Sequence, residues 1–115
     1  MGGGKTSELT NDAGFVSNAT SAGNVDRFGN MRFLRVSGLN GGAMSKNTYK
    51  TLYTVNSADA PNIAINYGFA IGYENNGPVR YGLVNIKTNG EVQVSPNEAV
   101  QSGCYWLIIA IWRMA

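Results

Sequence analysis

The sequence contains no histidine and only one cysteine, Cys104, and this excludes several kinds of chemistry. Without histidine, the chain lacks the commonest general acid–base residue and the commonest transition-metal ligand. A single cysteine cannot form an intrachain disulfide, and no histidine is present to activate it as a nucleophile. We therefore interpret Cys104 as a small buried apolar residue, and we expect packing or assembly to stabilise the fold.

Charge and long apolar runs are also scarce. Only 14% of the 115 residues are charged, and the net charge of +2 is too small to indicate nucleic acid as a partner. There is no run of about 20 apolar residues that could cross a membrane, so we expect no membrane insertion. No acidic residue lies inside an apolar run, and no acidic or cysteine cluster has metal-ligand spacing. The sequence therefore predicts no catalytic residues, no metal and no cofactor.

Glycine and small polar residues are abundant. The 15 glycines and many asparagines indicate numerous turns, and the length suits one domain. Residues 1–30 contain few large apolar side chains and cannot form a core of their own. We expect residues 1–30 to be a neck or linker segment and residues 31–115 to be a β head domain.

Residues 63–73 alternate strictly between large and small side chains. The large ones are Ile63, Ile65, Tyr67, Phe69, Ile71 and Tyr73, and the small ones are Ala64, Asn66, Gly68, Ala70 and Gly72. A period of two predicts a β-strand, because successive side chains point to opposite faces. We expect the large side chains to face the core. The segment is long for one strand, so we expect a bulge or break at Gly68 or Gly72.

Residues 81–87 and 91–94 predict a hairpin whose register can be derived. A three-residue loop over residues 88–90 pairs Ile86 with Val92, keeps the apolar residues on one face, and puts Lys87 beside Glu91. Gly90 then takes the left-handed position. Residues 31–36 and 49–55 are weaker strand candidates.

The run at residues 105–112 is apolar on both faces, which predicts a central strand covered on both sides. Trp106 and Trp112 are expected in the core. In so small a chain, a second sheet can cover one face and a neighbouring subunit the other. The patterns together predict an all-β fold, a small antiparallel β-sandwich that is jelly-roll-like or knob-like and assembles as a trimer.

Three segments resemble a known class of protein. Residues 7–16, Ser-Glu-Leu-Thr-Asn-Asp-Ala-Gly-Phe-Val, resemble a segment that recurs in tail-fibre and receptor-binding proteins of tailed bacteriophages. Residues 81–92 resemble the hairpin of compact fibre-tip domains, and residues 103–111 resemble their terminal strand. The resemblance implies a homotrimeric head at the tip of a tail fibre, in a virion or encoded by a prophage, that binds a glycan or protein receptor on the bacterial surface.

The loop at residues 74–80 is the expected contact for such a receptor, because it places amide and guanidinium donors between two tyrosines. The candidate receptor-binding residues are Tyr73, Glu74, Asn75, Asn76, Arg80 and Tyr81. Two other interpretations stay open. One is a structural or assembly module of a phage tail or baseplate without its own receptor. The other is a fragment of a carbohydrate-active enzyme, in which Glu74 and Glu98 meet across a bound glycan.

Overall fold

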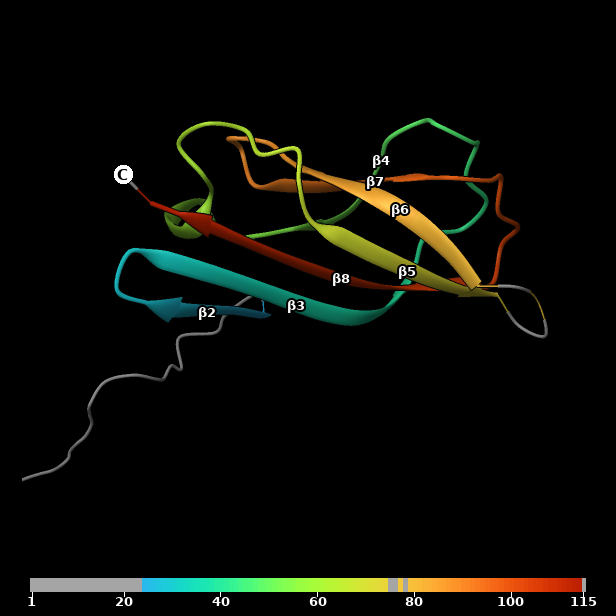
Figure 1. Cartoon of the computed structure of the whole chain (residues 1–115), viewed down its shortest axis with the longest axis horizontal. Coiled ribbons are helices and arrows are strands. Elements are labelled where there is room, and N and C mark those ends of the chain that lie inside the picture. Colours follow the sequence, from blue (N-terminus) through green and yellow to red (C-terminus); the bar gives the residue numbers. More distant parts are fainter. Residues whose placement is uncertain (1–23, 75–76, 78, 115) are drawn as a thin grey trace, which may run out of the picture.

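The computed structural model describes residues 24–74, 77 and 79–114. The strands are β2 (Val25–Phe28), β3 (Met31–Asn40), β4 (Lys50–Thr54), β5 (Phe69–Glu74), β6 (Val79–Ile86), β7 (Glu91–Pro96) and β8 (Cys104–Arg113). One turn of 3₁₀-helix, η2 (Ser57–Asp59), lies between β4 and β5 (Figure 1). Every neighbouring pair of strands is antiparallel, which confirms the all-β, antiparallel prediction.

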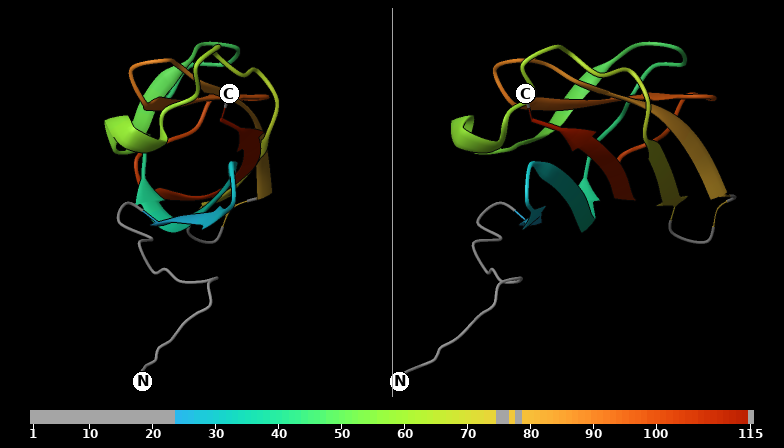
Figure 2. Two further views of the ribbon diagram at one scale, coloured as in Figure 1. Left: turned by 90° about the vertical axis from the view of Figure 1, so that its left-hand side faces the viewer. Right: turned by 60° about the vertical axis from the view of Figure 1, so that its left-hand side comes forward.

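The strands form one sheet in the order β2-β3-β8-β5-β6-β7-β4. This sheet curls around its own core until the edge strands β2 and β4 come near each other (Figure 2). The side chain of Asn24, just before β2, donates a hydrogen bond of 3.1 Å to the hydroxyl of Tyr53 on β4. The two-sheet sandwich that we expected is therefore replaced by one continuous curled sheet. Irregular registers in the β3–β8 and β4–β7 pairs accompany this curvature.

The core fills the inner face of the curled sheet. Its largest fully buried side chains include Trp106, Trp112, Leu34, Ile86 and Ile108. The predicted burial of both tryptophans is confirmed, and Cys104 is fully buried, as expected.

The orientation that we predicted for residues 69–73 is wrong. Ala70 and Gly72 are buried on the inner face, whereas Phe69 and Tyr73 are about half exposed on the outer face. The reason is the indole of Trp106, which occupies the space beneath β5. A Cβ on Gly72 would lie 2.9 Å from Cη2 of Trp106, so only a residue without a side chain fits there. The first half of the predicted strand is also wrong: residues 63–68 form only an isolated bridge between Ile65 and Ile86, and Ile63 and Tyr67 are exposed. The strand begins directly after Gly68, one of the two predicted break positions, whose φ is +145°.

The β6–β7 hairpin has the predicted register. Ile86 pairs with Val92 and Val84 pairs with Val94. Gly90 has a φ of +94°, and its amide donates a hydrogen bond to the carbonyl of Lys87. The ammonium of Lys87 lies 3.6 Å from the carboxylate of Glu91. This local prediction is confirmed in full.

Strand β8 is central, as predicted, because it lies between β3 and β5. Its inner side chains are buried, but its outer side chains, among them Tyr105 and Ile111, are about half exposed. No other described segment covers its outer face.

The edge strand β2 pairs with β3, and its Val25 is fully buried. The described sheet therefore begins upstream of the head boundary that we placed after residue 30.

Candidate functional site

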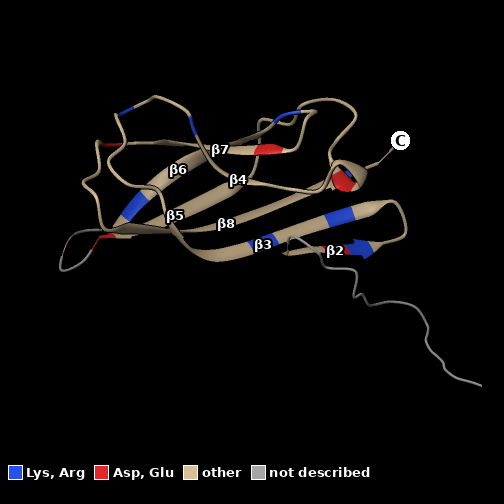
Figure 3. Ribbon diagram, turned by 180° about the vertical axis from the view of Figure 1, so that it is seen from behind, with Lys and Arg blue, Asp and Glu red and all other residues tan. Residues whose placement is uncertain are grey.

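The outer surface of the three central strands β8, β5 and β6 is mostly apolar, and we call it the outer apolar face. Its members all point away from the core: Tyr105, Leu107, Ile109 and Ile111 on β8, Phe69, Ile71 and Tyr73 on β5, and Val79, Tyr81 and Leu83 on β6. The strand register places them in rows, with Ile71 opposite both Leu107 and Tyr81. Strands β5 and β8 carry charged residues only at their ends (Figure 3).

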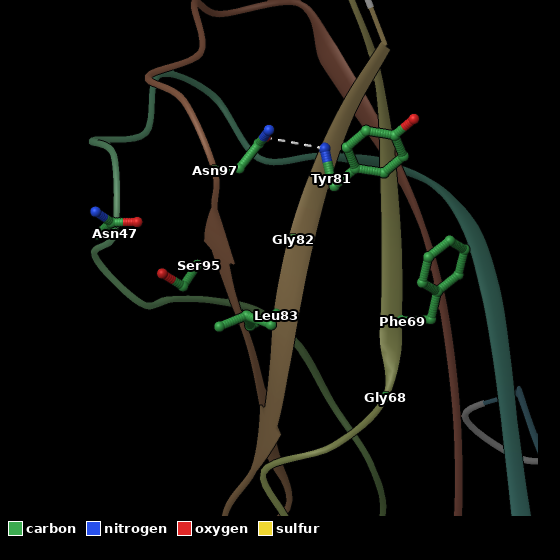
Figure 4. Close-up of a pocket in the computed structure, with 8 residues that line it drawn as sticks. All are labelled: Asn47, Gly68, Phe69, Tyr81, Gly82, Leu83, Ser95 and Asn97. Carbon is green, nitrogen blue, oxygen red and sulfur yellow. Dashed lines mark hydrogen bonds between the residues drawn. The ribbon is translucent and has the colours of Figure 1, made fainter.

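A pocket of about 320 Å³ lies where this face meets β7 and the loop that contains Asn47. We call it the amide pocket, and its lining residues are Asn47, Gly68, Phe69, Tyr81, Gly82, Leu83, Ser95 and Asn97. Figure 4 shows the aromatic rings of Phe69 and Tyr81 on one side, and the polar side chains of Asn47, Ser95 and Asn97 on the other. None of the lining residues is charged.

Hydrogen bonds fix the polar side of the pocket. The backbone N–H of Tyr81 donates to the side-chain Oδ1 of Asn97 at 3.1 Å. The backbone N–H of Asn97 donates to the carbonyl of Tyr81 at 2.9 Å. The backbone N–H of Asn47 donates to the carbonyl of Pro96 at 3.0 Å, and Asn47 adopts a left-handed φ of +58°. Asparagine tolerates this conformation better than most residues do. The side chain of Asn97 is therefore held by the backbone of β6, and the backbone of Asn47 is held by the end of β7.

Of the described residues in and beside the predicted receptor loop, only Tyr81 lines the amide pocket. The guanidinium of Arg80 donates to the carboxylate of Glu74 at 3.2 Å, so these two residues neutralise each other. Tyr73 lies on the outer apolar face, and Tyr81 lines the amide pocket. Asn75 and Asn76 fall outside the described residues.

Sequence reasoning identified only Tyr81 and missed the other seven residues that line the pocket: Asn47, Gly68, Phe69, Gly82, Leu83, Ser95 and Asn97. Phe69 was assigned to the core because its strand was oriented the wrong way. Asn47 and Asn97 lie in turns, and no local pattern distinguishes them from other turn asparagines. A signal was available for Leu83 and Ser95, because the hairpin register that we predicted places them opposite each other.

A second polar cluster lies at the end of the sheet near η2. Asp59 is fully buried, and its Oδ1 accepts hydrogen bonds from Nε of Arg27 at 2.7 Å and from Nε of Arg32 at 2.8 Å. Nη2 of Arg27 donates to the other carboxylate oxygen at 3.1 Å. The indole nitrogen of Trp112 donates to the carbonyl of Asp59 at 2.9 Å. Both carboxylate oxygens are thus occupied by structural partners.

Burial and charge set the protonation states in the core. Burial alone would raise the pKa of Asp59, but the hydrogen bonds from Arg27 and Arg32 outweigh it, so the pKa is lowered and the carboxylate stays ionised. Burial raises the pKa of the Cys104 thiol, and the nearby Glu74 carboxylate adds to this effect. Cys104 is therefore held as an unreactive thiol.

Within the described part of the chain, no group of three or more cysteine, aspartate or glutamate side chains is placed to hold a metal ion. Over the same residues, no helix is long and apolar enough to span a membrane. The chain matches no protein-family model, and no curated protein matches it.

Proposed function

We propose that this chain is the receptor-binding head of a bacteriophage tail fibre, which attaches to the bacterial surface without catalysing a reaction. The phage assignment rests on the resemblance of residues 7–16, which lie outside the described part of the structure. The binding role rests on the geometry of the head itself.

The amide pocket is the observation that carries the binding role. Two half-exposed aromatic rings and three polar side chains line one open hollow, and this is the kind of surface that ligand sites use. Two acids of the head are occupied by structural partners, because Asp59 is held by two arginines and Glu74 by Arg80. Recognition through loops and outward side chains of a rigid β scaffold fits this arrangement.

The proposed head is a homotrimer. The outer side chains of β8 form an apolar strip in the middle of the sheet, with only Arg113 at its end carrying charge. Soluble monomers rarely expose large contiguous apolar patches. Copies of the chain around a symmetry axis would cover this strip with an equally uncharged surface.

The direct test is a fluorescent fusion of the full chain applied to a panel of bacterial strains. We expect saturable labelling of at least one strain, and no release of reducing sugar from its envelope. If no strain is labelled at micromolar concentration, the alternative of a structural tail module replaces the receptor-binding role. Release of reducing sugar would instead support the enzyme interpretation.

A further inference from the structure

We propose that the amide pocket binds a single neutral sugar unit of a surface glycan. This inference rests on the proposed receptor-binding function and names the ligand class for the same site. Three observations support it: the lining carries no charge, it combines aromatic with polar side chains, and Asn97 keeps free hydrogen-bond donors.

The lining points to an uncharged ligand. All eight lining residues are neutral. Arg80, which precedes the lining residue Tyr81, forms an ion pair with Glu74. A phosphate, carboxylate or ammonium group placed here would lose water without meeting an opposite charge among the lining residues. Neutral hydroxyl and acetamido groups carry no such penalty when hydrogen-bond partners are present.

One side of the pocket is aromatic and the other is polar. A pyranose ring likewise has a face of C–H bonds and an edge of hydroxyl groups. One side offers the rings of Phe69 and Tyr81, which can stack against a face of C–H bonds (Figure 4). The other side offers Asn47, Ser95 and Asn97, which can bond the hydroxyl groups on the ring edge. A volume of about 320 Å³ lies at the low end of the range for small-molecule pockets, about 300–1,000 Å³. One sugar unit therefore suits the space better than a folded peptide does.

Asn97 has a defined role in this site. Its Oδ1 already accepts the hydrogen bond from Tyr81, so its Nδ2 group keeps two hydrogens for a ligand. The same contact fixes the amide orientation before a ligand arrives, which reduces the conformational entropy lost on binding. The hydroxyl of Ser95 has no hydrogen-bond partner among the described residues and can both donate and accept.

The experiment measures binding of the methyl glycosides of glucose, galactose and N-acetylglucosamine to the full chain by ¹H–¹⁵N NMR titration. We expect at least one glycoside to give saturable shifts at the amides of Tyr81, Leu83, Ser95 and Asn97. Asn97→Asp should weaken binding by about tenfold or more, because it keeps the acceptor for Tyr81 but removes both ligand donors. Tyr81→Ala should weaken it similarly, and Tyr81→Phe should keep most of the affinity.

Two matched variants control for general effects. Asn40 also accepts a hydrogen bond from a nearby backbone amide, that of Gly42, so Asn40→Asp makes the same chemical change outside the pocket. Tyr67 is as exposed as Tyr81 but does not line the pocket, so Tyr67→Ala removes a comparable ring elsewhere. Both variants should bind the glycoside as the parent does.

The outcomes separate this inference from the proposed function. If the parent labels cells, but labelling survives periodate oxidation of surface sugars and Asn97→Asp labels equally, the head binds a receptor while the sugar inference is overturned. If a glycoside binds in the pocket but no strain is labelled, the sugar site stands and the receptor role fails. Absence of shifts with all three glycosides, together with unchanged labelling by Tyr81→Ala, would overturn the site.

Discussion

A Cβ atom placed on Gly72 would lie 2.9 Å from Cη2 of Trp106, closer than packed side chains tolerate. The same position would be 2.8 Å from Sγ of Cys104. Gly72 therefore sets how closely β5 can approach the indole beneath it. This contact also decides the orientation of the strand, because it forces the large side chains of β5 to the outer face.

Adding one methyl group at Gly72 should therefore cost more stability than removing a whole ring from its neighbour. We expect Gly72→Ala to lower the free energy of unfolding by about 1–3 kcal/mol through overpacking. Tyr73→Ala should change it much less, because Tyr73 is about half exposed on the outer face. Urea unfolding of both variants checks this. The opposite ranking would mean that the large residues of β5 face the core after all.

The buried carboxylate of Asp59 should make stability depend on pH in the acid range. Its pKa is lowered in the folded state, so its stabilising contribution is complete above the ordinary aspartate pKa of about 3.9. That contribution is lost as the pH falls through the lower, folded value. Asp59→Asn should cost about 3 kcal/mol or more at neutral pH, because it leaves two arginines without their anion. The variant should also show a weaker acid dependence than the parent.

Asp26 provides the control for this prediction. It is exposed on β2 and forms no ion pair with another described residue. Asp26→Asn should therefore keep the stability and the acid dependence of the parent. Chemical denaturation at a series of pH values measures all three proteins. Equal acid dependence in Asp59→Asn and the parent would contradict the role of Asp59.

Two glycines with positive φ allow backbone strain to be separated from crowding. Gly29 has a φ of +62° with open space around it, whereas a Cβ on Gly90 would lie 2.6 Å from the carbonyl oxygen of Val55. Gly29→Ala should cost about 1–2 kcal/mol from the left-handed conformation alone. Gly90→Ala should cost more, and Gly90→Val more still. Thermal melting gives the order, and a Gly90→Val protein that melts with the parent would show that the loop has another shape.

The two faces of β8 should respond differently to the same substitution. Ile111→Asn changes an outer residue and should convert the proposed trimer to a folded monomer of about 12 kDa. Ile108→Asn changes a fully buried residue and should prevent folding, because it places an unsatisfied amide in the core. Analytical ultracentrifugation with circular dichroism distinguishes the two results. A parent that sediments only as a monomer would refute the trimer.

The sequence predicts local relationships in this fold better than distant ones. The β6–β7 register could be derived, because the apolar pattern and the turn glycine lie within a few residues of one another. The alternation at residues 63–73 correctly indicated a strand over its second half, from Phe69 onward, but not over residues 63–68. It could not reveal which face points inward, since Trp106, the residue that decides this, lies more than 30 positions away. Alternation in side-chain size shows that a segment is a strand, but not which set of side chains faces the core.

The candidate site was less accessible for the same reason. Tyr81 was identified because it borders a polar loop, but the residues opposite it come from β7 and from a distant turn. A pocket built from β5, β6, β7 and the Asn47 turn exists only once the sheet has curled. The choice between two packed sheets and one curled sheet likewise depends on how β2 and β4 meet, and no local pattern records that meeting.

The closeness of the two edge strands has a consequence for behaviour at high protein concentration. An open sheet edge offers unpaired backbone groups on which another chain can add as a further strand, and this begins many fibrillar aggregates. Here the Asn24–Tyr53 hydrogen bond links the flank of β2 to β4, and the Arg27–Asp59 ion pair ties β2 to η2. These two side-chain contacts hold the ends of the sheet near each other and so reduce the room for a further strand. We therefore expect this domain to exchange strands between neighbouring copies less readily than a domain whose sheet edges lie far apart.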